Sequence, residues 1–338
     1  MTLQINQMNR RHFIAYSASL VTMAYARGPY ASSQLTWSNA APLPIKTQEL
    51  YPTVHQGKLY VAGGIASRSG GLYFTNRFFS YDPSNDEWQN ETDLPENLHH
   101  AALVSSGDRL FLVGGFNGSF DHFWRMRERV YEYKEGAWLN MPSLPQPQAE
   151  GVVAHHQNEV HLVSGQSPRG DANVKRDDHV EVPTHLVWQA NGSTWEQAAP
   201  LPLARNSATG GWIDDQLIVT GGRNAQGNFD ATHIYDKRED RWRDAQPLPL
   251  PQAGTASVVV DDGIIVFGGE IFVPEAGVFK NSWRYSMSED QWQAYPDMKT
   301  PRHGIGAGKI ADQIFVIGGA TQPSGKGTSS LNEVLSLS

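Results

Sequence analysis

The sequence contains no cysteine among its 338 residues. The protein therefore cannot use a disulfide, a cysteine nucleophile or a cysteine-ligated metal, and its stability must come from packing. Basic residues are also scarce, because 27 Lys and Arg stand against 35 Asp and Glu. This imbalance argues against nucleic acids and anionic membrane surfaces as partners. The sequence also lacks an HExxH motif, a phosphate-binding loop, a GxSxG elbow and a dinucleotide fingerprint, so we expect no metal and no cofactor.

Residues 1–26 have the composition of an export signal. Arg10 and Arg11 precede an apolar run over residues 13–24, and small residues at 24 and 26 fit a cleavage site. The run is shorter than the roughly 20 residues that span a bilayer. Residues 9–14 are similar to the twin-arginine export motif; an ordinary Sec signal and an uncleaved anchor are the alternatives. We expect a signal at 1–26, a linker at 27–35, and a periplasmic or secreted mature chain with net charge −10 that is not held at a membrane.

A small-residue pair ends an apolar strand six times along the chain. The pairs are Gly63-Gly64, Gly114-Gly115, Ser164-Gly165, Gly221-Gly222, Gly268-Gly269 and Gly318-Gly319. Such pairs indicate backbone that needs positive φ or close approach. Regular spacing of about 50 residues is typical of a repeat architecture.

A tryptophan and then a proline-rich turn follow five of the six pairs. These tryptophans are Trp88, Trp138, Trp195, Trp242 and Trp292. The sixth repeat ends without one, and the missing piece stands at the other end of the chain as Trp37 with its turn at 41–44. We therefore predict a circular closure in which the N-terminal strand completes the last blade and leaves no open sheet edge.

The repeated Gly-Gly, aromatic strand and spaced Trp resemble the Kelch family over residues 36–338. The resemblance implies an all-β fold: a six-bladed β-propeller with four-stranded antiparallel blades. The tryptophans are interpreted as packing between neighbouring blades, with no chemistry of their own.

Counting back from each pair gives three rings of equivalent positions near one mouth of the central channel. Sixteen residues back lie Thr47, Leu98, Gln148, Arg205, Gln252 and Arg302. Fifteen back lie Gln48, His99, Ala149, Asn206, Ala253 and His303, and fourteen back lie Glu49, His100, Glu150, Ser207, Gly254 and Gly304. Strand alternation predicts that the first and third rings face one way and the second the other.

Glu49, His100 and Glu150 occupy one level on three consecutive repeats, with Arg205 and Arg302 expected nearby. Carboxylates beside histidine and arginine suit general acid–base catalysis or the binding of a polar or anionic ligand. The alternative is a hydrogen-bonded polar ring that fills the channel. Directly after two pairs come Arg223 and Glu270, which can face a ligand or form a structural salt bridge with each other.

The loops that follow the pairs differ in length and chemistry. The third, over residues 166–184, is the longest and carries Arg169; the second contains Phe120, Phe123 and Trp124. Aromatic side chains beside polar ones suit sugar stacking or protein contact, or else they pin the loop to the propeller. His155 and His156 fall at a hairpin turn, where a solvated turn is favoured over a metal site.

Among exported Kelch proteins, the chain resembles the N-acetylneuraminate epimerase (mutarotase) family. Glu270, in Gly268-Gly269-Glu270, stands where this family has its active-site glutamate. The arginine that the family has a few residues further on is replaced here by Val273-Pro274-Glu275. The resemblance implies an isomerase of acidic or amino sugars, or less closely a polysaccharide lyase. The predicted catalytic residues are Glu49, His100, Glu150 and Glu270, and the predicted substrate-binding residues are Arg205, Arg223, Arg302, His303, His99, Arg169 and Trp124.

A binding scaffold and a copper oxidase are the two other functions that a Kelch propeller suggests. A non-catalytic scaffold would bind a protein or cell-wall ligand through the same loops, so the expected partner is a small molecule, an oligosaccharide or a protein. Galactose-oxidase-like copper chemistry is excluded, because its cofactor needs a Tyr–Cys cross-link and the chain has no cysteine.

Overall fold

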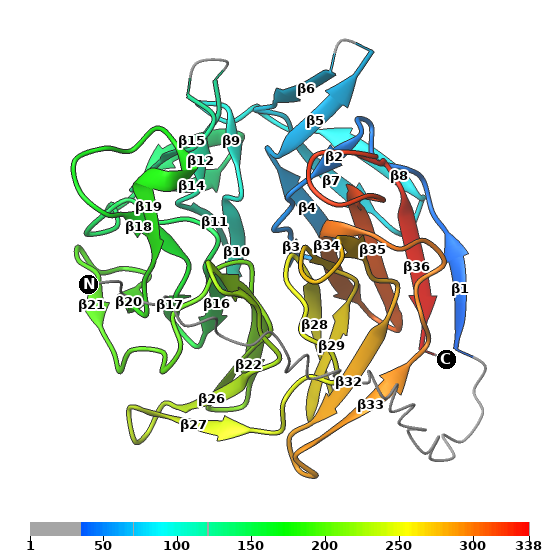
Figure 1. Ribbon diagram of the computed structural model, residues 1–338. Helices are drawn as coiled ribbons and strands as arrows, with labels where there is room; N and C mark the ends of the chain where they lie inside the picture. Colours follow the sequence, from blue (N-terminus) through cyan, green and yellow to red (C-terminus); the bar gives the residue numbers. More distant parts are fainter. Residues whose placement is uncertain (1–34, 70, 120–121, 338) are drawn as a thin grey trace, which may run out of the picture.

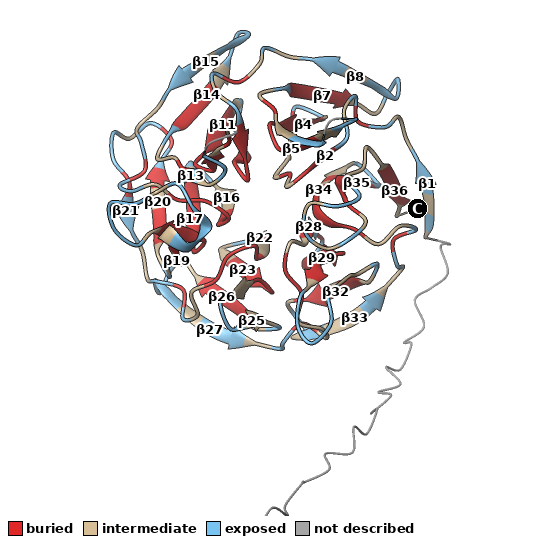
Figure 2. Ribbon diagram, turned by 45° about the horizontal axis from the view of Figure 1, so that its top comes forward, coloured by how far each residue is buried: buried red, intermediate tan, exposed pale blue. Residues whose placement is uncertain are grey.

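The computed structural model describes residues 35–69, 71–119 and 122–337. Within this part of the chain, six four-stranded antiparallel sheets surround a central opening (Figure 2). The predicted signal at 1–26 and most of the predicted linker lie outside the described residues. Among the residues described, no helix is long and apolar enough to cross a membrane.

Each of the first five sheets takes its strands in chain order from the inside outwards. Sheets 1 and 2 consist of β3 (Thr53–His55), β4 (Lys58–Ala62), β7 (Phe78–Asp82) and β8 (Glu87–Asn90), and of β10 (Ala102–Ser106), β11 (Arg109–Val113), β14 (Val130–Lys134) and β15 (Ala137–Asn140). Sheets 3 and 4 consist of β16 (Val152–His156), β17 (Glu159–Val163), β20 (His185–Gln189) and β21 (Glu196–Gln197), and of β22 (Thr209–Ile213), β23 (Gln216–Thr220), β26 (Thr232–Asp236) and β27 (Arg241–Ala245). Sheet 5 consists of β28 (Ala256–Val260), β29 (Gly263–Phe267), β32 (Ser282–Ser286) and β33 (Gln291–Tyr295).

Sheet 6 joins the two ends of the described chain, as the sequence predicts. It contains β34 (His303–Ile310), β35 (Gln313–Ala320), β36 (Asn332–Ser336) and, as its outer strand, β1 (Thr36–Asn39). In Figure 1 the blue β1 lies beside the red β36. Trp37 pairs with Leu335 in an antiparallel register, so the outer edge of this sheet is supplied by residues almost 300 positions away.

The six tryptophans connect neighbouring sheets by one repeated hydrogen bond. Each indole N–H donates to the backbone carbonyl four residues after the tryptophan of the preceding sheet. The donor–acceptor pairs are Trp88–Ala41, Trp138–Thr92, Trp195–Pro142, Trp242–Ala199, Trp292–Gln246 and Trp37–Pro296, with N···O distances of 2.7 to 3.2 Å. The last bond closes the circle, so the predicted packing role of these residues is confirmed.

The small-residue pairs turn the chain sharply where each second strand ends. Every residue of the six pairs has positive φ, which favours glycine because it has no Cβ. A Cβ on Gly63 would lie 2.2 Å from the carbonyl oxygen of Leu98 in the next sheet. Ser164 is the exception, and its hydroxyl donates to the equivalent carbonyl of Arg205 at 2.8 Å.

Apolar side chains fill the space between adjacent sheets. Phe111 of sheet 2 packs with Val160, Leu162 and Trp188 of sheet 3, and all four are at most 3% exposed. Burying each such side chain contributes about 1.5–3 kcal/mol. The sheets are therefore held to their neighbours around the whole ring.

Short strands follow the pairs and form what we call the loop face of the ring. They are β2 (Thr47–Gln48), β5 (Ile65–Arg68), β6 (Gly71–Phe74), β9 (Leu98–His99), β12 (Phe116–Asn117), β13 (Arg125–Met126), β18 (Gln166–Pro168), β19 (His179–Glu181), β24 (Arg223–Asn224), β25 (Gly227–Asn228), β30 (Glu270–Ile271) and β31 (Gly277–Val278), with a 3-10 turn, η1 (Arg176–Asp178). The opposite face consists of the tight hairpin turns within the sheets.

Candidate functional site

One residue from each repeat forms a ring, called here the mouth ring, on the loop side of the channel. Its members are Glu49, His100, Glu150, Ser207, Gly254 and Gly304, with φ between 53° and 65° in all six. Backbone of this hand costs a residue with a side chain about 1–2 kcal/mol, whereas glycine adopts it freely. Four of the six positions nevertheless carry side chains, and such strain is typical of functional sites.

The mouth ring is held by backbone hydrogen bonds over most of its circumference. They run from Ser207 to Glu150, from Gly254 to Ser207, from Gly304 to Gly254 and from Glu49 to Gly304, with N···O distances of 2.7 to 3.1 Å. Between Glu49, His100 and Glu150 the contacts are made by side chains instead. The structure thus brings together the three residues that the sequence placed on one level.

His100 lies between the two carboxylates. Its Nε2 is 3.1 Å from Glu49 Oε2 and 3.1 Å from Glu150 Oε1. Its Nδ1 is 2.6 Å from Nδ1 of His99, whose Nε2 is 2.8 Å from the carbonyl oxygen of Phe123. The His100 and Glu150 side chains are only 4% and 3% exposed, whereas Glu49 is 17% exposed and forms the accessible side.

These partners determine where the protons lie. A carbonyl oxygen only accepts, so His99 Nε2 carries a hydrogen and His99 Nδ1 is left as an acceptor for His100 Nδ1–H. The carboxylates accept from His100 Nε2–H, so His100 is an imidazolium. Burial lowers the pKa of His100, but the charges of Glu49 and Glu150 outweigh it and hold the pKa above its usual value. Burial and then the charge of His100 lower the pKa of His99 to about 3, so His99 is neutral.

Glu49 and Tyr51 complete this side of the site. Burial would raise the pKa of Glu49, but His100, and then His303 and Arg223, hold it well below the usual range. Burial, followed by the charges of Glu150 and Glu49, raises the pKa of Tyr51 well above its usual value. Tyr51 is therefore a neutral phenol. It lines the axial channel beneath the ring, a cavity of about 110 Å³.

Tyr51 is a residue that the sequence reasoning missed. Its repeat position is occupied elsewhere by smaller residues that also line the channel: Ala102, Val152, Thr209, Ala256 and Gly306. A single large aromatic side chain among five smaller ones was the available signal.

A second charged group, from the other side of the ring, consists of Arg223, Glu270 and His303. Arg223 Nη1 donates to Glu270 Oε1 at 2.6 Å, and His303 Nε2 lies 3.3 Å from Glu270 Oε2. The backbone N–H of Ser324 also donates to Glu270 Oε2, at 3.0 Å. Burial lowers the pKa of Arg223, but Glu270, and then Glu150, raise it above the usual value. Of the two alternatives for Arg223 and Glu270, the pairing with each other is present in the structure.

Four polar atoms of these two groups are buried without a hydrogen-bond partner: Glu150 Oε2, Arg223 Nε, and both His303 Nδ1 and His303 Nε2. Leaving a buried polar atom unpaired costs about 1–3 kcal/mol. A ligand that supplies both a donor and an acceptor would satisfy such atoms. The arrangement thus suits a small polar ligand better than a closed structural salt-bridge network.

Aromatic rings surround the two histidines. The Trp124 ring centre lies 5.3 Å from that of His99 and 6.0 Å from that of His100, and Phe116 stacks on His99 at 5.1 Å. Trp124 therefore lies beside the site, as expected, but as a wall against the histidines. Phe120 lies outside the described residues.

Arg205 and Arg302 lie elsewhere than the sequence suggested. Both are fully buried inside sheets: Arg205 donates to the Val219 carbonyl and contacts His233, and Arg302 donates to two carbonyls of β35 and to Glu333. Strand alternation would have turned them toward Glu49, but the positive φ of the mouth ring interrupts it. We therefore assign them to the core rather than to the site.

Arg169 is also away from the charged groups. It is exposed in the loop after β18, where its backbone N–H donates to the carbonyl of Asp178. The structure thus brings together Glu49, His99, His100, Glu150, Arg223, Glu270, His303 and Trp124, but not Arg169, Arg205 or Arg302.

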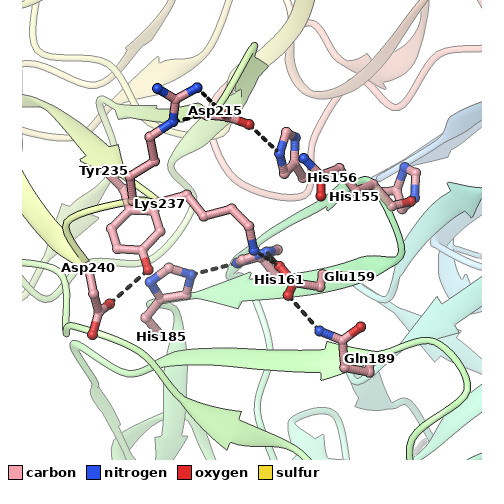
Figure 3. Close-up of polar contacts among 12 residues, drawn as sticks. His155, His156, Glu159, His161, His185, Gln189, Asp215, Tyr235, Lys237 and Asp240 are labelled. Carbon is pink, nitrogen blue, oxygen red and sulfur yellow. Dashed lines mark hydrogen bonds and ion pairs between the residues drawn. The ribbon is translucent and has the colours of Figure 1, made fainter.

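Other histidines meet between sheets 3 and 4 (Figure 3). His161 Nδ1 is 2.9 Å from His185 Nε2, while His161 Nε2 is 3.1 Å from Glu159 Oε2, which also binds Lys237. His156 is less solvated than expected of a turn, because it contacts Asp215 at 3.0 Å and stacks on Trp212. In the described part of the chain, no group of three or more His, Asp or Glu is arranged to hold a metal ion.

Comparisons with known proteins agree with this architecture. A Kelch motif matches residues 52–95. The chain is 27% identical over 195 residues to the Kelch-like protein terF of Aspergillus terreus, covering 55% of this chain and 41% of that protein. It is 25% identical over 214 residues to an N-acetylneuraminate epimerase of Haemophilus influenzae (51% and 55%), and 24% identical over 217 residues to the Kelch-like protein 36 of Bos taurus (60% and 34%). These matches span little more than half of each relative's length, or less.

Proposed function

We propose that this chain is an exported six-bladed Kelch propeller that binds and isomerises an acidic or amino sugar. The Kelch motif at residues 52–95 and the distant relation to N-acetylneuraminate epimerases support this proposal. The observation that carries the proposal is the imidazolium of His100 between Glu49 and Glu150, facing an arginine–glutamate pair. Carboxylates and histidines within reach of one ligand suit proton transfer at a sugar ring.

In the proposed reaction, Glu150 takes the proton of the anomeric hydroxyl through its unpartnered Oε2. The bond between the anomeric carbon and the ring oxygen breaks, and His303 gives a proton to that oxygen. The open form closes on either face of the carbonyl, and reversing the two transfers restores both residues. Arg223 binds a substrate carboxylate with its free Nε.

The experiment is NMR exchange spectroscopy of the two anomers, with and without protein, for N-acetylneuraminate, glucuronate and glucosamine. We expect faster interconversion with at least one of them. Glu150→Gln should slow it at least a hundredfold, as loss of a general base does. Glu135→Gln, in a hairpin turn of the opposite face, removes the same charge and should have no effect. No acceleration of any of the three sugars would contradict the proposal.

A binding protein without catalysis is the second candidate, because large apolar side chains are exposed on the loop face. Phe123 is 38%, Phe272 is 41% and Val273 is 69% exposed. In that case, Phe272→Ser would weaken binding of a partner, while Glu150→Gln would not. Saturable partner binding that depends on Phe272, without sugar isomerisation, would favour this function.

A further inference from the structure

The two faces of the ring differ in charge. The hairpin turns of the opposite face are rich in acidic residues: Asp86, Asp108, Glu135, Asp214, Asp215, Asp240, Asp261, Asp262, Asp290 and Asp312. On the loop face, within the described residues, several cations have no carboxylate in ion-pair range, including Lys46, Arg68, Arg125, Arg169, Arg176 and Lys326. These unpaired cations are available to attract an anion to the loop face.

Three guanidinium groups on the loop face lie over aromatic rings. Arg68 lies 4.9 Å from the ring centre of Tyr73, Arg176 lies 5.4 Å from that of Trp124, and Arg223 lies 5.3 Å from that of Phe272. Stacking fixes the plane of a guanidinium and leaves its N–H edge available for a carboxylate. Arg68 and Arg176 are exposed, and no side-chain acceptor in the described chain occupies that edge.

These three positions belong to different sectors of the ring. Arg68 ends β5, Arg176 begins η1 just before β19, and Arg223 begins β24; Figure 2 shows β5, β19 and the partner strand β25 spread around the central opening. Only Arg223 reaches the buried groups of the mouth, because it contacts Glu270. Arg176 lies further out, over Trp124, and Arg68 lies over Tyr73 in another sector.

We propose that the loop face binds an acidic oligosaccharide, whose end residue enters the mouth at Arg223 while carboxylates further along the chain are held by Arg68 and Arg176. This proposal rests on the sugar site proposed above and extends it from a free sugar to a chain. An acidic glycan is favoured over a protein because Arg68 and Arg176 stack on aromatic rings without an ion pair among the described residues and stand on separate loops.

The test is isothermal titration calorimetry with α2,8-linked sialic acid and with galacturonate, each as monomer, dimer, tetramer and hexamer, and with neutral maltohexaose. We expect at least tenfold tighter binding of the hexamer than of the monomer in one acidic series, and the gain should shrink at high salt. Arg68→Gln combined with Arg176→Gln should abolish the gain and leave monomer binding unchanged. Lys134→Gln combined with Lys309→Gln loses the same charge outside the loop face and should keep the gain.

Equal affinity for monomer and hexamer in both series would overturn the proposal, as would maltohexaose binding as tightly as the acidic hexamers. Retention of the full gain by the double arginine variant would also overturn it, as would a protein ligand on this face with no gain from glycan length. Isomerisation is measured separately, by NMR with monosaccharides. Length-dependent binding without isomerisation would therefore sink the enzymatic proposal and leave this one standing.

Discussion

Two regions of the molecule each contain a pair of buried histidines, and the two pairs make the same series of hydrogen bonds. At the mouth, the hydrogen bonds run from the Phe123 carbonyl through His99 and His100 to Glu49 and Glu150. Between sheets 3 and 4 they run from the Ala199 carbonyl through His185 and His161 to Glu159 (Figure 3). Geometry alone would therefore give the two pairs the same protonation.

The surrounding charges make the two pairs different. His100 faces two carboxylates, and its pKa is raised despite burial. Glu159 is already bound to Lys237, and burial, followed by the neighbouring His185, lowers the pKa of His161 to about 3. A buried histidine is thus charged where the carboxylates around it exceed the cations, and neutral where they are balanced. The comparison separates a site prepared for proton transfer from a structural contact.

The largest expected difference between the two regions is in activity. His100→Gln should slow anomer interconversion by about 10²-fold, because the charge that orients Glu49 and Glu150 is lost and a misplaced catalytic group costs about that much. His161→Gln should leave the rate unchanged, since no part of that cluster belongs to the mouth. NMR exchange spectroscopy measures both. If the two variants lost the same fraction of the isomerisation rate, the charge on His100 would not mark a catalytic site.

The next difference is in stability at acid pH. The pKa of His161 is lowered to about 3 and that of His185 to about 4, below the unfolded value of about 6.5. Their contribution to stability is therefore full above pH 6.5 and is lost as pH falls toward 4. For His100, whose pKa is raised, the contribution is full below pH 6.5 and is lost as pH rises through the folded pKa.

Replacing His161 and His185 should make the free energy of unfolding less dependent on pH below neutrality. His161→Phe with His185→Val copies Phe111 and Val130, the residues at the same positions in sheet 2. Between pH 7 and pH 5, the free energy of unfolding measured in urea should fall by about 4 kcal/mol less in this variant than in the native chain, about 2 kcal/mol for each histidine. An unchanged loss would mean that the folded chain protonates these histidines as readily as the unfolded chain does, so that their pKa values are not lowered by folding.

The fold could be predicted in detail because its rules are local and repeated. Six small-residue pairs and six tryptophans indicated the repeat, and the displaced Trp37 predicted that the N-terminal strand joins the last sheet, as it does. The predicted level of Glu49, His100 and Glu150 also holds, because equivalent positions of a repeat meet around its axis. These inferences needed only spacing.

The direction of side chains could not be predicted in the same way. Arg205 and Arg302 were expected at the mouth because strand alternation was assumed. The positive φ two residues further on is indicated by glycine at 304, but Ser207 gives no such sign after Arg205. The meeting of His161 with His185 depends on register between strands. The sequence did show that His161 is unusual, because the same position in the other repeats holds an apolar or aromatic residue: Tyr60, Phe111, Ile218, Ile265 and Phe315.

The smallest expected effect concerns the strain of the mouth ring at Ser207, the ring position whose side chain carries no charge. Ser207 has a φ of 53°, and its hydroxyl donates only to Asn206. Ser207→Gly should be more stable than Ser207→Ala by about 0.5–1 kcal/mol, because relief of about 1–2 kcal/mol of strain exceeds the entropy that glycine loses on folding.

Urea unfolding of the two variants measures this difference, with Ser38→Gly and Ser38→Ala as the matched control. Ser38 is exposed in β1, where extended backbone makes glycine the less stable of the two. If Ser207→Ala and Ser207→Gly had the same free energy of unfolding, the backbone of the mouth ring would not be strained at this position. If glycine is favoured at 207 without loss of activity, the strain at Glu49, His100 and Glu150 is retained for the side chains placed there.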